Sequence, residues 1–124
     1  MSIEKVGYNR DGGPIVAEIK SGYAQPGSYG FLLWEANANR IVMEKKGNFI
    51  NSDDDSYPLP TPNEANHERI AECVATVAIT PDIKNYRIDL IVSQDGGELG
   101  RVFKEGESDG PTVMVDIFVQ LEST

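Results

Sequence analysis

Runs of alternating apolar and polar residues in the last third of the chain limit its fold more than any other feature. Tyr86–Ser93 is apolar at every second residue, with Ile91 out of step, and Val113–Leu121 carries Val, Ile or Leu at every odd position. Between them, Glu98–Lys104 follows Gln94–Gly97, whose Asp-Gly-Gly sequence tolerates the positive φ that tight hairpin turns need. A period of two is typical of strands with one buried face, so we expect antiparallel strands here.

Four earlier segments also have the composition of strands, and turn residues separate them. The most aromatic segment, Tyr29–Glu35, is apolar on both faces, so we expect it at the centre of a sheet with Trp34 in the core. The segment Ile70–Ile79 fits a helix and a strand about equally well, and its β-branched end favours a strand. The segments are Ile15–Lys20, Tyr29–Glu35, Arg40–Lys46 and Ile70–Ile79.

About seven short strands separated by turns predict an all-β fold, an antiparallel β-sandwich that is immunoglobulin-like or C2-like in general shape, with a barrel as the alternative. Cys73 is the only cysteine, so the disulfide of antibody domains cannot form. Asn51–Pro62 contains three prolines and is expected to be a long crossover loop. The Thr-Pro-Asn-Glu sequence before and within Pro62–Glu68 resembles a capping box, which predicts a short helix there.

The length of 124 residues is typical of one domain. We expect residues 14–124 to form a single β-sandwich and residues 1–13 to be a loose leader, because this segment is polar and ends in Asp-Gly-Gly-Pro. Its start does not have the apolar segment of a secretory signal, and no apolar run is long enough to span a membrane. These features predict a cytoplasmic protein without membrane insertion.

Acidic residues outnumber basic ones by 20 to 11, which gives a formal net charge of -9. This charge argues against binding to nucleic acid or to anionic membrane surfaces, and its simplest role is solubility. The sequence contains no Gly-x-Ser-x-Gly elbow, no Walker A sequence and no Gly-x-Gly-x-x-Gly loop. We therefore assign no catalytic residues and no resident cofactor, and we expect a protein that is not an enzyme.

The candidate ligand-binding residues lie on predicted loops. Three adjacent aspartates offer oxygen ligands of the kind that Ca²⁺ prefers, although the residues after them do not match an EF-hand. If successive strands alternate in direction, three loops lie at one end of the sandwich, and Asp95 comes near the three adjacent aspartates, Asp53–Asp55. The simpler interpretation of the acidic run is a solvated loop. The three loops are Ser21–Ser28, Gly47–Glu68 and Gln94–Gly97; the candidate ligand or metal residues are Asp53, Asp54, Asp55 and Asp95; the candidate loop contacts are Tyr23, Tyr57 and His67.

The final predicted strand, Val113–Leu121, is apolar on both faces, because Met114 and Phe118 lie opposite its odd-numbered residues. Such a strand has to be covered on both faces, by this chain or by another subunit. The leading hypothesis is therefore a non-catalytic β-sandwich module for protein–protein interaction or self-assembly. Such a module binds a protein partner or forms a homo-oligomer. One alternative is a calcium- or glycan-binding sandwich that uses the end around Asp53–Asp55. Another is an acidic inhibitor or immunity-type protein that blocks a basic partner surface.

Overall fold

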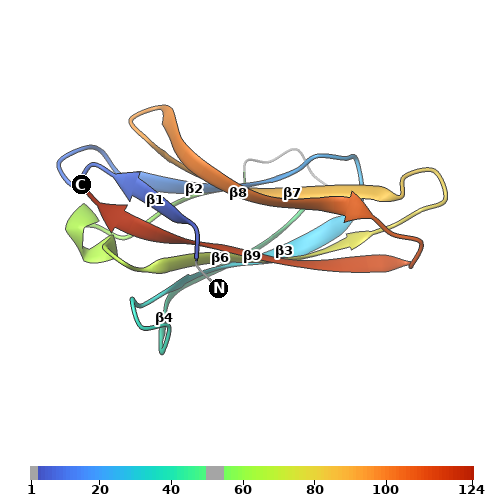
Figure 1. Cartoon of the computed structure of the whole chain (residues 1–124), viewed down its shortest axis with the longest axis horizontal. Helices are drawn as coiled ribbons and strands as arrows, with labels where there is room; N and C mark the ends of the chain where they lie inside the picture. Colours follow the sequence, from blue (N-terminus) through green and yellow to red (C-terminus); the bar gives the residue numbers. More distant parts are fainter. Residues whose placement is uncertain (1–2, 50–54) are drawn as a thin grey trace.

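The structure is a computed structural model that describes residues 3–49 and 55–124, and it is a sandwich of two packed sheets (Figure 1). Sheet A has five strands in the order β1-β9-β6-β3-β4, and sheet B has four in the order β5-β2-β7-β8. The predicted all-β sandwich is confirmed. The strands are β1 (Lys5–Tyr8), β2 (Ile15–Ser21), β3 (Gly27–Trp34), β4 (Ile41–Asn48), β5 (Ser56–Pro58), β6 (Ile70–Ala78), β7 (Asn85–Gln94), β8 (Gly97–Glu107) and β9 (Thr112–Ser123), and a 3-10 helix, η1, spans Asn63–Asn66.

Neighbouring strands are antiparallel, except that β1 and β9 are parallel. The last two strands of an immunoglobulin domain share one sheet. Here β8 lies in sheet B and β9 lies in sheet A, so the chain crosses the sandwich between them. The likeness to an immunoglobulin domain is therefore one of general shape and not of strand order.

The core lies between the two sheets and follows from the period of two. In β6, every second residue from Ala71 to Val77 is buried, whereas the residues between them lie on the outside of sheet A. The strand predicted for Ile70–Ile79 is therefore confirmed, to within one residue. Cys73 belongs to this inward-facing row, and burial raises the pKa of its thiol to about 12, as expected for a packing residue.

The prediction of a loose leader is wrong for Lys5–Tyr8, which forms β1 and pairs with the end of β9. Val6 and Tyr8 are buried in the core, and the Tyr8 hydroxyl donates a 2.7 Å hydrogen bond to the backbone oxygen of Asn63. Burying these two side chains offsets the conformational entropy lost by ordering so short a segment.

The breaker residues after β1 are also fixed, because polar side chains from distant segments bind their backbone. The Gln94 amide nitrogen donates to the backbone oxygens of Asn9 and Gly13 at 2.6 and 2.9 Å. The Asn63 amide nitrogen donates to the oxygen of Gly13 at 2.9 Å, and Asp95 accepts the N–H of Gly13 at 3.0 Å. Each bond satisfies a backbone group that would otherwise need water.

The loops do not group as predicted, because the segment between β4 and β6 contains a strand that sequence reasoning missed. β4 and β6 are both antiparallel to β3, so they run in the same direction and the chain crosses the length of the sandwich between them, through β5 of sheet B. Ser21–Ser28 therefore lies with the loop after β6, where the N–H of Ala78 donates to Pro26 at 2.8 Å. The Gln94–Gly97 turn lies at the opposite end of the sandwich.

The short helix predicted over Pro62–Glu68 is present as the four-residue 3-10 helix η1. Its N-cap is Pro62, whose ring cannot accept the hydrogen bond that a capping box supplies. Within the ranges that the structure describes, no helix is long and apolar enough to cross a membrane.

Candidate functional site

The candidate calcium ligands are not brought together. Asp53 and Asp54 lie outside the described residues. Asp55 is beside Ile19 of β2, whose N–H donates to its backbone oxygen at 3.0 Å. Asp95 comes directly after the last residue of β7, which pairs with the first residue of β2, four residues from Ile19. At about 3.3 Å per residue, the two aspartates stand roughly 13 Å apart along β2.

The carboxylates that the structure describes have protein partners instead. Asp55 accepts a 2.6 Å hydrogen bond from the Tyr29 hydroxyl, which also contacts the hydroxyl of Tyr57. Burial, and then this carboxylate, raise the pKa of Tyr29. In residues 3–49 and 55–124, no three His, Cys, Asp or Glu side chains are grouped so as to hold a metal ion.

The three candidate loop contacts do not form one surface either. Tyr23 is exposed on the loop between β2 and β3. Tyr57 lies in β5, where its ring stacks on Phe31 with centroids 5.8 Å apart, so it belongs to the core. His67 lies at the other end of the sandwich, next to Ser123 of β9.

His67 has no nucleophile beside it among the contacts that the structure describes. Its Nδ1 accepts the backbone N–H of Ser123 at 3.0 Å, and its Nε2 lies 3.6 Å from Oε1 of Glu68. A histidine that binds a backbone N–H is fixed in position, but it activates no hydroxyl through that contact.

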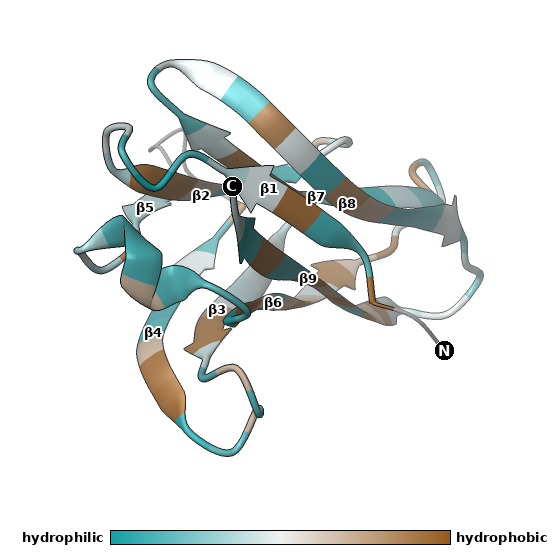
Figure 2. Cartoon of the chain, turned by 60° about the vertical axis from the view of Figure 1, so that its left-hand side comes forward, coloured by the Kyte–Doolittle hydropathy of each residue, from teal (hydrophilic) through white to brown (hydrophobic). Residues whose placement is uncertain are grey.

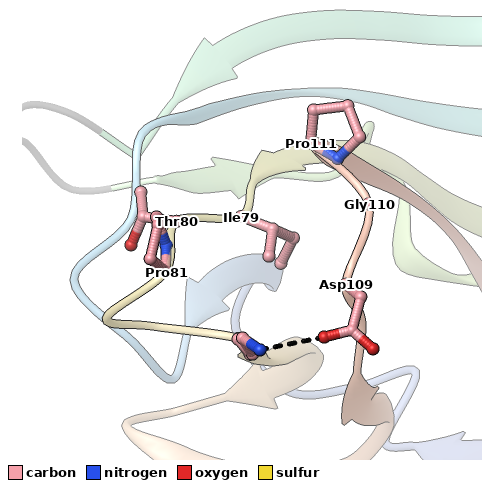
Figure 3. Close-up of a pocket in the computed structure, with 7 residues that line it drawn as sticks. Ile79, Thr80, Pro81, Asp109, Gly110 and Pro111 are labelled. Carbon is pink, nitrogen blue, oxygen red and sulfur yellow. Dashed lines mark ion pairs between the residues drawn. The ribbon is translucent and has the colours of Figure 1, made fainter.

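A cavity of about 400 Å³ lies between the loop that follows β6 and the loop that precedes β9 (Figure 3). Its charged side chains pair with each other, because Lys84 Nζ is 3.0 Å from Oδ1 of Asp109. Much of the remaining lining is proline and glycine, namely Pro81, Gly110 and Pro111. Such a lining provides few groups that could select a ligand.

The outer face of sheet A, which points away from sheet B, is the stronger candidate. It carries large apolar side chains that this chain leaves exposed, with Met114 71%, Phe118 40% and Ile41 42% accessible. The hydrophobic part of β4 lies on a hairpin that projects from the sandwich (Figure 2). A hollow of about 270 Å³, here called the sheet A hollow, is lined by Ile3, Trp34, Ala38, Ile70, Glu72 and Phe118.

Strand register explains why these residues meet. Trp34 is the last residue of β3 and pairs with Ile70 of β6 on one side and with Ile41 of β4 on the other. Glu72 pairs with Phe118 of β9, two residues further along the same face of β6. Directly opposed residues on neighbouring strands have their side chains in contact range, so four strands contribute to one apolar surface.

An acidic pair lies within this apolar surface. The indole N–H of Trp34 donates to Oε1 of Glu72 at 3.0 Å. Burial raises the pKa of Glu72, and so does a hydrogen bond with the side chain of Asp116, whereas the Trp34 N–H lowers it. Asp116 of β9 pairs with Val74, two residues from Glu72 in β6, so the two carboxyl groups are diagonal neighbours on one face. The sheet A hollow therefore contains an acid whose pKa is raised by its surroundings.

The outer face of sheet B differs, because its charges neutralise one another. Asp89 is buried and accepts hydrogen bonds from Arg87 at 2.8 Å and from Arg101 at 2.7 Å. The Arg87 guanidinium also lies 4.1 Å from the ring centroid of Phe103. Each arginine reaches a further glutamate, Glu105 or Glu98. This network fixes the sheet and offers a ligand little unpaired charge.

Sequence reasoning correctly placed Met114 and Phe118 on the face of the final strand opposite its odd-numbered residues, and this chain leaves both exposed. It missed Trp34, Ile70 and Glu72. The expectation that Trp34 is a core residue is wrong, since it lines the sheet A hollow. The signal that could have found it is the alternation in β6, which puts Ile70 and Glu72 on the face opposite to Ala71 and Cys73. The chain matches no known protein family, no curated protein sequence and no solved structure.

Proposed function

We propose that the protein is a non-catalytic binding module that contacts another protein through the outer face of sheet A. The observation that supports this proposal is the sheet A hollow, with Trp34, Ile70 and Phe118 in its lining and Met114 exposed on the same face. Scattered apolar residues are normal on a protein surface, but a contiguous patch with a hollow is typical of an interaction site.

The net charge of -9 favours a protein partner over nucleic acid.

Site-specific photocross-linking tests this proposal. Met114 is replaced by the photoreactive amino acid p-benzoylphenylalanine, and the protein is irradiated in an extract of the cells that make it. As a matched control, the same amino acid replaces Phe103, which is 49% exposed on the outer face of sheet B. We expect a discrete cross-linked product from position 114 that disappears when Phe118→Ser is added. Equal cross-linking from positions 114 and 103 would overturn the proposal.

The mass of the cross-linked product also identifies the kind of assembly. A product of twice the chain mass, together with a dimer in light scattering, indicates a second copy of this chain. A product of any other mass indicates a different protein.

A further inference from the structure

The sheet A hollow combines apolar, aromatic and acidic side chains in one small cavity. Its volume of about 270 Å³ is below the roughly 300–1,000 Å³ of pockets that enclose drug-sized ligands. A cavity of this size on the face of a sheet suits one inserted side chain. The acids in and beside it, Glu72 and Asp116, determine the charge that the inserted side chain should carry.

Resting on the proposed function, we infer that the sheet A hollow receives a basic side chain, lysine or arginine, from a partner protein. Glu72 and Asp116 supply the opposite charge for the ammonium or guanidinium group. Trp34 and Phe118 supply aromatic rings, which attract cations, and Ile70 supplies an apolar surface for the alkyl stem.

An opposite charge nearby favours the ionised form of a carboxyl group, so a bound basic side chain lowers the raised pKa of Glu72. Binding should therefore strengthen as the pH rises and Glu72 ionises. Among the described residues, the other charged side chains on this face are, by strand register, Glu44 and Lys46 of β4, Lys5 of β1 and Glu122 of β9.

Charge also argues against a second copy of this chain as the occupant. Two copies that face each other across a two-fold axis through the hollow would bring two Glu72 and two Asp116 side chains together. Like charges at an interface oppose association. The net charge of -9 in turn attracts a basic partner over long range.

Fluorescence provides a direct readout, because Trp34 is the only tryptophan in the chain. The full chain is titrated with acetyl-Leu-Lys-Leu-amide and, as a matched probe, with acetyl-Leu-norleucine-Leu-amide. We expect a saturable change in Trp34 fluorescence, with the lysine peptide binding at least about tenfold more tightly than the norleucine peptide. The affinity for the lysine peptide should fall at low pH.

Two double variants separate the local effect of the acids from the effect of net charge. E72Q with D116N should weaken binding of the lysine peptide about tenfold. D82N with E107Q removes the same number of charges at exposed positions outside the hollow, and should weaken it less than about threefold. Circular dichroism confirms the fold of each variant, and Phe118→Leu, which keeps an apolar side chain, provides a second perturbation of the hollow.

The outcomes separate this inference from the proposed function. Equal affinity for the lysine and norleucine peptides, equal effects of the two double variants, or no binding of either peptide would overturn the basic side chain as the occupant. Cross-linking specific to position 114 would still support a protein-binding face in each of these cases. Loss of that cross-linking specificity would overturn the proposed function itself.

Discussion

Trp34 and Glu72 are joined across two neighbouring strands, because the indole N–H donates a 3.0 Å hydrogen bond to Oε1 of the carboxylate. This bond satisfies the polar edge of the indole, while the residue still lines the sheet A hollow. It also lowers the pKa of Glu72, against the larger effect of burial and the further effect of Asp116. The charge of the hollow therefore depends on side chains from three strands.

Trp34→Phe removes the N–H and keeps an aromatic ring. We expect the pKa of Glu72 to rise further, because the ionised carboxylate loses a donor, and the free energy of unfolding to fall by about 1–2 kcal/mol. An NMR titration of the Glu72 carboxyl carbon and urea unfolding measure the two effects. A Glu72 pKa that stays unchanged or falls in this variant would show that the indole does not stabilise the ionised form.

Glu72→Gln changes how stability depends on pH. A carboxyl group whose pKa is raised by folding binds its proton more tightly in the folded state. The free energy of unfolding therefore falls as the pH rises from the unfolded value, about 4.3, through the raised folded value. Gln does not titrate, so we expect the difference in Tm between Glu72→Gln and the wild type to be more positive at pH 7 than at pH 4. Calorimetry at both pH values measures it, and a difference of the opposite sign contradicts the raised pKa.

Asp89→Asn should show the opposite dependence on pH. Burial raises the pKa of Asp89, but the hydrogen bonds from Arg87 and Arg101 outweigh it and the pKa is lowered. This stabilisation is present above the unfolded value, about 3.9, and is lost as the pH falls through the folded value. We expect Asp89→Asn to cost about 1.5–3 kcal/mol at pH 7 and less at pH 2, measured by urea unfolding. An equal cost at both pH values would rule out the ion pairs as its cause.

Asn63→Ala tests the contacts that hold the segment after β1. The Asn63 amide donates to the backbone oxygens of Gly12 and Gly13 at 3.0 and 2.9 Å, so we expect a loss of about 1–3 kcal/mol. Hydrogen exchange should accelerate in β1 and the segment that follows it, and much less in β6. Asn37→Ala serves as the control, because its side chain makes an exposed contact within the β3–β4 turn. Equal acceleration across all strands would show that β1 has no separate stability.

The sequence predicts the long strands well because each has one buried face. In β9, burial follows the odd-numbered residues from Val115 to Leu121, as the apolar period indicates. β1 and β5 have only four and three residues, so neither can display a period. Both are fixed by long-range partners, such as Asn63 for Tyr8 and β2 for Ser56–Pro58.

The candidate site could be predicted only in part, because it also depends on long-range contacts between strands. Alternation assigns Met114 and Phe118 to a common face, but it does not say which strands lie beside them. The grouping of Asp55 with Asp95 depended on the number of strands between them, and one missed strand of three residues reversed it. Trp34 looked like a core residue because its strand is apolar on both faces, and only the register with Ile70 places it on the outside.

Two glycines in neighbouring strands provide the last prediction. A methyl group added at Gly47 would overlap the ring and hydroxyl of Tyr29, which is buried and bonded to Asp55. We expect Gly47→Ala to lower the free energy of unfolding by about 1–3 kcal/mol, because the tyrosine has to shift. At Gly30, an added methyl group meets no atom of the described residues within 4 Å.

Gly30→Ala should therefore stabilise the protein by about 0.4–1 kcal/mol, since it reduces the entropy of the unfolded chain without a clash. Urea unfolding of both variants measures the contrast. If Gly47→Ala is as stable as Gly30→Ala, Tyr29 does not occupy the position against β4 that the hydrogen bond to Asp55 gives it. The two sheets would then pack differently along the edge that β4 and β5 form.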